Sequence, residues 1–65
     1  MKVIITIPQA LTGDIIGDLD KRNGKLIDFK WTENTVVITA EIPRKKNYTK
    51  DIKILTKGAA LIKFD

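Results

Sequence analysis

The chain lacks cysteine and histidine entirely, and these two absences remove most enzyme classes before any motif is considered. Without cysteine, no disulfide or thiolate metal site can stabilise the fold. Without histidine, there is no imidazole general base, no Ser-His or Cys-His triad, and no ligand of the kind that transition metals most often take. We therefore expect no enzyme activity, no cofactor, no metal site and no catalytic residue within this chain.

Long apolar runs are missing too. The longest, residues 3–7, is closed by Pro8 and is too short for a signal-peptide core or a membrane span. The absence of cysteine also fits a reducing compartment. The sequence thus predicts a soluble cytoplasmic protein that does not contact a membrane.

What remains is the composition of one small folded domain. The chain has 65 residues, of which 43% are hydrophobic, 31% charged and only 6% aromatic, and its net charge is +4. These proportions are typical of globular rather than disordered chains. We find no linker, repeat or low-complexity stretch, and we expect residues 1–65 to form a single domain.

The first half of the chain predicts a strand followed by a helix. Residues 3–7 are nearly all β-branched, as in a strand that is buried on both faces. Pro8 is well placed for the first turn of a helix. Residues 9–22 then form an amphipathic helix, because apolar side chains recur every four residues at Leu11, Ile15 and Leu19.

Glycine occurs at two positions within this predicted helix. Gly13 and Gly17 each cost roughly 1 kcal/mol relative to alanine, and their spacing predicts a helix face pressed closely against a strand. They are more typical of packing than of a phosphate cradle. Asn23 and Gly24 tolerate the left-handed conformation and are expected to end the helix.

The second half predicts a hairpin, a helix and a last strand. Residues 25–32 alternate apolar and polar positions in their second half, and residues 35–42 alternate again after a tip at residues 33–34. A second amphipathic helix begins after a cap at Asn47 or Thr49, and Gly58 ends it. Residues 59–64 form the last strand. The order β-α-β-β-α-β predicts an α+β ferredoxin-like two-layer sandwich, with two helices on one face of a four-stranded antiparallel sheet.

The hairpin leaves one orientation open. Ile27, Phe29 and Trp31 share one side of the first hairpin strand, and the register or a bulge decides which face of the sheet they occupy. On the open face they would form an apolar patch of the kind that binds a partner. The pattern favours the alternative, in which they belong to the core.

Charge is distributed unevenly. Between positions 44 and 57, six cationic side chains face a single acid, Asp51. A basic loop and helix on one edge suits contact with nucleic-acid phosphates, although lysine-rich surfaces are often merely solvated. The candidate phosphate-binding residues are Arg44, Lys45, Lys46, Lys50, Lys53 and Lys57.

The acidic residues of the first helix offer a weaker candidate. Asp14 and Asp18 lie one turn apart, as a carboxylate pair or part of a metal site would. No third ligand accompanies them, so a solvated helix face near the positive end of the helix dipole is the better interpretation.

Three blocks of the sequence resemble the C-terminal (fifth) domain of elongation factor G, a translational GTPase. Residues 13–19 have the pattern Gly-Asp-x-Ile-Gly-Asp-Leu, residues 37–43 resemble its Val-Ile-x-Ala-x-Val-Pro pattern, and residues 48–58 resemble its segment Tyr-x-Thr-Asp-Leu-Arg-Ser-Leu-Thr-Gln-Gly. The resemblance covers nearly the whole chain, in order. It implies the same ferredoxin-like fold and docking on the large ribosomal subunit, beside ribosomal RNA and the stalk-base protein.

The sequence also departs from this family. Asn23, Lys53 and Ala59 stand where the family commonly has arginine, which makes bidentate contacts that lysine makes poorly and alanine cannot make. The loop before Tyr48 is shorter than usual, and the family's aromatic-acidic tail is absent. A divergent relative such as a ribosomal-protection paralogue, or an engineered domain, would fit these departures.

Two functions therefore remain as hypotheses. The first is a non-catalytic ribosome-docking module, working with the remaining domains of a parent GTPase. No P-loop occurs here, because residues 57–60 do not approach the Gly-x4-Gly-Lys-Ser/Thr pattern. The alternative is a free-standing or engineered ferredoxin-like scaffold that pairs with a protein partner or with itself.

Overall fold

The computed structural model describes residues 1–43 and 47–64. Its elements are the strands β1 (Lys2–Pro8), β2 (Lys25–Trp31), β3 (Thr35–Glu41) and β4 (Leu61–Phe64), and the helices α1 (Thr12–Lys21) and α2 (Tyr48–Leu55). A short 3-10 turn, Gln9–Leu11, leads into α1. The four strands form one antiparallel sheet in the order β2-β3-β1-β4.

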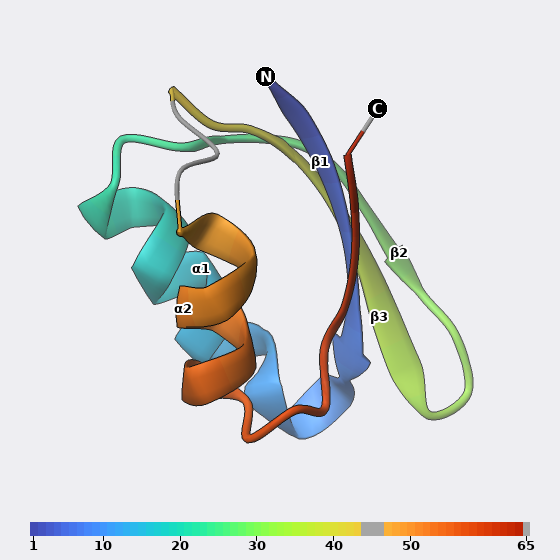
Figure 1. The fold of residues 1–65 in the computed structure, drawn as a ribbon. Coiled ribbons are helices and arrows are strands. Elements are labelled where there is room, and N and C mark those ends of the chain that lie inside the picture. The colour runs from blue at the N-terminus through green and yellow to red at the C-terminus, as the bar shows by residue number, and fades with distance from the viewer. Residues whose placement is uncertain (44–46, 65) are drawn as a thin grey trace.

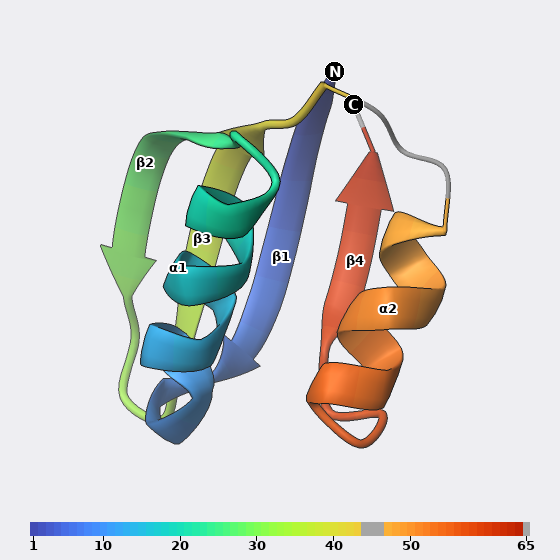
Figure 2. The same cartoon turned by 90° about the vertical axis from the view of Figure 1, so that its left-hand side faces the viewer.

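Both helices lie on the same face of this sheet (Figures 1 and 2). The βαββαβ order and the two-layer arrangement confirm the predicted α+β ferredoxin-like fold. The other face of the sheet carries no helix among the described residues, so each strand has one side toward the core and one toward solvent.

The core is a consequence of this arrangement. Alternate side chains of the central strands point toward the helices, and side chains on successive turns of each helix point toward the sheet. The buried side chains are Val3, Ile5, Ile7, Ile15, Leu19, Val36, Ile38, Ala40, Ile42, Tyr48, Ile52 and Ala60.

The expectation that residues 3–7 are buried on both faces is wrong. Val3, Ile5 and Ile7 are at most 1% exposed, whereas Ile4 and Thr6 are only half-buried because they lie on the open face. A β-branched run is therefore also compatible with a central strand that is covered on one side only.

Pro8 and Asn47 differ in role from what the sequence predicts. Pro8 ends β1 in an extended conformation and precedes the 3-10 turn rather than opening an α-helix. Asn47 precedes α2 with φ +61°, but its side chain makes no capping hydrogen bond. Its contribution is the left-handed conformation, which asparagine tolerates better than most residues.

The expected end of α1 is confirmed. Asn23 has φ +59°, and the N–H of Gly24 donates to the Leu19 carbonyl at 2.7 Å. A Cβ at Gly24 would lie 3.0 Å from Leu19 Cδ2 and 3.1 Å from Leu19 O. Glycine at position 24 thus relieves crowding against Leu19 and is not there for a positive φ.

The packing role predicted for Gly13 and Gly17 is wrong. Both are exposed, and a Cβ built at either position meets no atom within 4 Å. These glycines lie on an exposed side of α1 that no strand presses against. Each glycine therefore lowers the stability of the helix through its backbone entropy, and no packing contact offsets this loss.

We therefore expect Gly17→Ala to stabilise the fold by about 0.5–1 kcal/mol, because alanine removes the backbone-entropy cost inside a helix. Thermal unfolding detected by circular dichroism measures the change. Gly24→Ala is the matched control and should gain less than Gly17→Ala, since its Cβ would crowd Leu19 at 3.0–3.1 Å. A loss of stability in Gly17→Ala would contradict this account of α1.

The open question about β2 is decided by a bulge. Its register with β3 shifts between Leu26 and Asp28, and this shift places Phe29 opposite Ile38 and Trp31 opposite Val36. Because Ile38 and Val36 face the helices, Phe29 and Trp31 share that face. Only Phe29 packs against the core, however; Trp31 is 56% and Ile27 52% exposed, so the prediction that all three are buried is wrong.

Candidate nucleic-acid interface

The structure describes half of the predicted basic site. Lys50 and Lys53 lie on α2, and Lys57 lies in the turn that comes after it. All three are exposed. The loop cations Arg44, Lys45 and Lys46 lie outside the described residues.

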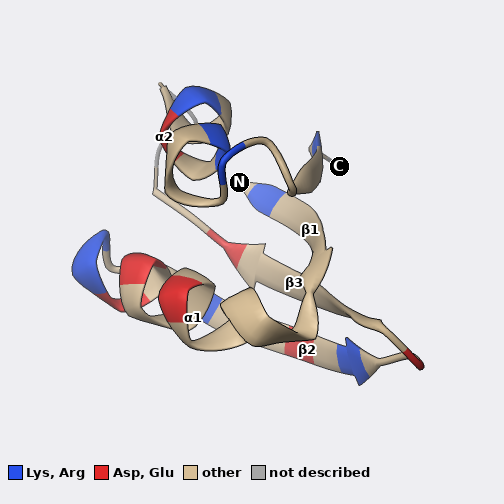
Figure 3. Cartoon of the chain, turned by 90° about the horizontal axis from the view of Figure 1, so that it is seen from below, with Lys and Arg blue, Asp and Glu red and all other residues tan. Residues whose placement is uncertain are grey.

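The buried residues of α2 determine which way the lysines point. Tyr48, Ile52 and Thr56 recur every four residues and are at most 4% exposed, so they form the inner face. Lys50 and Lys53 are three residues apart on the outer face. Figure 3 shows mainly blue segments along α2 and the turn after it, with red at one side, whereas α1 is mainly red with a blue end. We call Lys50, Lys53 and Lys57 the lysine stripe.

The turn after α2 places Lys57 in a rare conformation. Its φ is +55°, and the next residue, Gly58, has φ +82°. The N–H of Gly58 donates to the Lys53 carbonyl at 2.7 Å, and the N–H of Lys57 donates to the Ile54 carbonyl at 3.3 Å. These two bonds form a Schellman motif in which Lys57 takes the left-handed position that glycine usually occupies. They hold Lys57 at the end of α2, where a cation also complements the helix dipole.

Asp51 does not oppose the lysine stripe. Its Oδ2 lies 3.6 Å from Arg22 Nη2, so the acid on α2 is turned toward the end of α1. In the described part of the chain no ion pair links an acid to Lys50, Lys53 or Lys57. The outer side of α2 therefore presents charge of one sign, as a phosphate-binding surface requires.

Arg22 joins the two helices at this point. Its Nε and Nη2 donate to the two carboxylate oxygens of Asp18 at 2.8 and 2.9 Å. Its guanidinium carbon lies 4.6 Å from the centre of the Tyr48 ring, which begins α2. The hydrogen bonds with Asp18 raise the pKa of Arg22 further, so this group stays cationic at every working pH.

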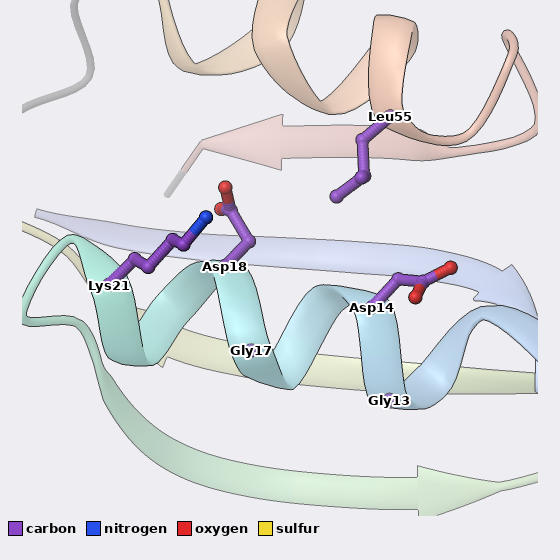
Figure 4. A pocket seen from close by; sticks show the side chains of 6 residues that line it. All are labelled: Gly13, Asp14, Gly17, Asp18, Lys21 and Leu55. Atoms are coloured by element: carbon purple, nitrogen blue, oxygen red, sulfur yellow. The ribbon is translucent and has the colours of Figure 1, made fainter.

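The space between the helices is an open groove. Gly13, Gly17, Asp14, Asp18 and Lys21 line it from α1, and Leu55 points into it from α2 (Figure 4). The Asp18 carboxylate is already engaged by Arg22, and no three metal-ligating side chains cluster within residues 1–43 and 47–64. The groove wall on α1 is mainly acidic and does not extend the lysine stripe.

Sequence reasoning missed the role of Arg22. Its spacing of four residues from Asp18 is a recognisable helix pair. Nothing in the sequence, however, places Tyr48 and Asp51 beside it, because those contacts arise only when α2 packs against α1. Arg22 is thus the residue toward which Asp51 turns, away from the lysine stripe.

Tyr48 gives a prediction about pH. Burial, aided by the nearby Asp18 carboxylate and opposed by Arg22, raises the pKa of Tyr48 from 10.0 to about 12. Since the folded pKa is above the unfolded one, ionising the phenol destabilises the fold. The free energy of unfolding should therefore be independent of this group below pH 10 and fall by about 2–3 kcal/mol as the pH rises from 10 toward 12.

Urea unfolding between roughly pH 9 and 12 tests this expectation, with Tyr48→Phe as the reference that lacks the phenol. Within the described residues the Tyr48 hydroxyl is buried without a hydrogen-bond partner, so the substitution should cost no stability at neutral pH. Tyr48 is the only tyrosine, and tyrosinate absorbance therefore reports its pKa directly. A midpoint near the ordinary value of 10.0 in the folded protein would refute the prediction.

Comparison with known proteins identifies the family of this chain. The sequence profile described as "Elongation factor G C-terminus" matches residues 1–65. The chain belongs to the elongation factor G C-terminal family. It is accordingly a translation-factor domain, and its ferredoxin-like fold is the one that the resemblance implied.

Relatives of this elongation factor G domain support the assignment. The chain is 39% identical over 62 residues to elongation factor G of Dehalococcoides mccartyi and 40% identical over 62 residues to that of Ehrlichia ruminantium. Each alignment covers 92% of this chain and 9% of the relative. A crystal structure of ttk003000868 from Thermus thermophilus superposes with a TM-score of 0.85 at 27% identity, over 98% of this chain and 10% of the other. The chain thus spans about a tenth of these proteins' length.

Two further findings bear on function. Within the described residues, neither helix is long and apolar enough to cross a membrane. The segment of Lys57, Gly58, Ala59 and Ala60 comes after a helix and precedes β4. A P-loop has the opposite order, strand then helix, so this turn does not have the geometry that cradles a nucleotide.

Proposed function

We propose that this elongation factor G C-terminal domain is a non-catalytic module that docks on the large ribosomal subunit. The lysine stripe contacts phosphates of ribosomal RNA, and Arg44, Lys45 and Lys46, which precede α2 in the sequence, add further cations to this contact. The observation that carries the proposal is that the outer side of α2 presents only positive charge, because Asp51 is turned toward Arg22.

A protein contact beside the RNA contact is supported by Ile54. This side chain is 68% exposed and lies one turn after Lys50, so it adjoins the lysine stripe. An apolar side chain next to cations suits a junction between RNA and protein, such as the one between ribosomal RNA and the stalk-base protein. GTP hydrolysis, in this proposal, belongs to other domains of a parent GTPase acting in the cytoplasm.

Three positions bear on how strong this docking is. Lys53, where the family commonly has arginine, is exposed on the lysine stripe and keeps its positive charge. Asn23 has φ +59°, a conformation that asparagine adopts more easily than arginine. Ala59 is exposed and supplies no charge. We therefore expect docking that depends on diffuse lysine-phosphate attraction more than on bidentate arginine contacts.

Equilibrium binding of the fluorescently labelled chain to purified ribosomal subunits tests the proposal. We expect saturable binding to large subunits and much weaker binding to small subunits. Unlabelled chain should compete for the same sites. Equal binding to both subunits would reduce the lysine stripe to a nonspecific polycation, and no binding by the folded chain would refute the proposal.

A further inference from the structure

The outer edge of β2 carries an unusual concentration of exposed apolar side chains. Leu26, Ile27 and Trp31 are 48–56% exposed, and the ring centres of Phe29 and Trp31 lie 5.0 Å apart. β2 stands at one end of the sheet order, so among the described strands nothing pairs with its outer edge. Soluble proteins usually protect such an edge with charge or by pairing it.

The charged residues of this strand lie at equal distances on either side of Phe29 and have opposite signs. Asp28 precedes Phe29 and Lys30 comes after it, while Ile27 and Trp31 lie one position farther out on either side. A strand that pairs antiparallel with a copy of itself about Phe29 puts each Asp28 opposite the other copy's Lys30. It also puts each Ile27 opposite the other copy's Trp31. We propose that this edge binds a second copy of the chain in that register.

The backbone directions allow this pairing. Thr32 donates its N–H to the Thr35 carbonyl at 2.9 Å, so the N–H of residue 32 points toward β3. Successive residues of a strand alternate between its two edges, and the N–H and C=O of Phe29 and Trp31 therefore point outward. The two copies of Phe29 can exchange a pair of backbone hydrogen bonds across the two-fold axis.

The two faces of the joined sheet receive different side chains. Asp28 pairs with Thr39 and Lys30 with Val37 in β3, which places both charges on the open face. Phe29 and Trp31 lie on the helix side, because they pair with Ile38 and Val36 of β3. The association thus forms ion pairs on one face and buries aromatic and aliphatic surface on the other.

Charge also disfavours the neighbouring registers. A shift by one residue reverses the faces of one strand. A shift by two puts Asp28 opposite Asp28 in one direction and Lys30 opposite Lys30 in the other. The bulge at Ile27 bends the strand and limits regular pairing to the segment from Ile27 to Trp31. A short interface of this kind predicts a dimer that dissociates on dilution.

Sedimentation equilibrium over a wide range of chain concentrations tests the proposal. We expect a monomer–dimer equilibrium for the native sequence. Lys30→Asp and Asp28→Lys should each raise the dimer dissociation constant by roughly tenfold to a hundredfold, because like charges then face each other twice. Trp31 is the only tryptophan, and its emission should shift to shorter wavelength as the dimer forms.

Charge exchange makes the test specific to the register. The double variant Asp28→Lys/Lys30→Asp restores opposite charges and should dimerise again, and an equimolar mixture of the two single variants should form a heterodimer. Lys63→Asp, on the strand at the other end of the sheet, makes the same charge change and should leave the native dimer intact. Circular dichroism confirms that each variant is folded. A monomer at the highest concentration, a dimer insensitive to both single reversals, or a double variant that stays monomeric would overturn the proposal.

Discussion

Reversing two charges of the lysine stripe, Lys50→Glu together with Lys53→Glu, is expected to weaken binding to large ribosomal subunits by roughly 100-fold at low salt. The reason is local: each reversal removes a cation that faces a phosphate and replaces it with an anion. Both side chains are exposed and opposite the buried face of α2, so the fold should be unaffected. Fluorescence anisotropy with a labelled chain measures the loss.

The control makes the same change in net charge elsewhere. Lys25 and Lys63 lie on the open face of the sheet, away from α2, and both are exposed. The variant Lys25→Glu/Lys63→Glu should retain most of the affinity, within a few-fold. Equal losses in the two variants would mean that the domain is attracted by its overall charge, and the assignment of the site to α2 would be wrong.

Removing the Arg22 side chain should cost more stability than an ordinary surface substitution does. Arg22→Ala leaves the Asp18 carboxylate, itself only 18% exposed, without its bidentate partner and removes the cation above Tyr48. We expect a loss of about 2–3 kcal/mol in the free energy of unfolding. For a chain of this size the loss corresponds to a fall in Tm of roughly 10–20 °C.

Arg22→Lys separates charge from geometry. Lysine keeps the cation but not the two-pronged contact or the stacking, so its Tm should lie between those of the native protein and Arg22→Ala. In a double-mutant cycle with Asp18→Asn, the two losses should be less than additive because the pair is then broken only once. Fully additive losses, or a loss below about 0.5 kcal/mol in Arg22→Ala, would show that this contact does not stabilise the fold.

The fold can be predicted because the apolar periodicity and the turn residues agree along the chain. Leu11, Ile15 and Leu19 mark one helix face, and alternate residues of 35–42 mark a strand with one side in the core. The sequence predicts the hairpin tip at Glu33 and Asn34, and the hydrogen bond from Thr32 to Thr35 confirms it. Local signals suffice here since each helix and strand has one apolar side, and such elements bury those sides by packing as two layers.

The errors arise where the answer depends on a neighbour. The spacing of Gly13 and Gly17 predicts packing, but spacing alone does not say which face of α1 meets the sheet. The alternation in β2 favours Trp31 in the core, but β2 is an edge strand and extends beyond the cover that the helices provide. In both cases the residue type is compatible with two environments, and tertiary structure selects one of them.

The candidate site is only partly visible in the sequence. The cluster of cations from 44 to 57 can be counted, and the spacing of Lys50 and Lys53 places them on one helix face. The orientation of Asp51 away from that face cannot be predicted, because it depends on Arg22, which lies at the end of α1 and far from α2 in the sequence. The sequence likewise points to Gly58 alone as the helix end, whereas Lys57 also adopts the left-handed conformation.

The central claim, that lysine-phosphate contacts dock this domain, is tested most directly by the salt dependence of its affinity for large ribosomal subunits. If the three lysines of the stripe each contact a phosphate, the logarithm of the binding constant should fall with the logarithm of salt concentration with a slope of about −2 or steeper. In Lys50→Glu/Lys53→Glu the slope should become shallower by about two. A native slope near zero, or the same slope in both proteins, would contradict the account.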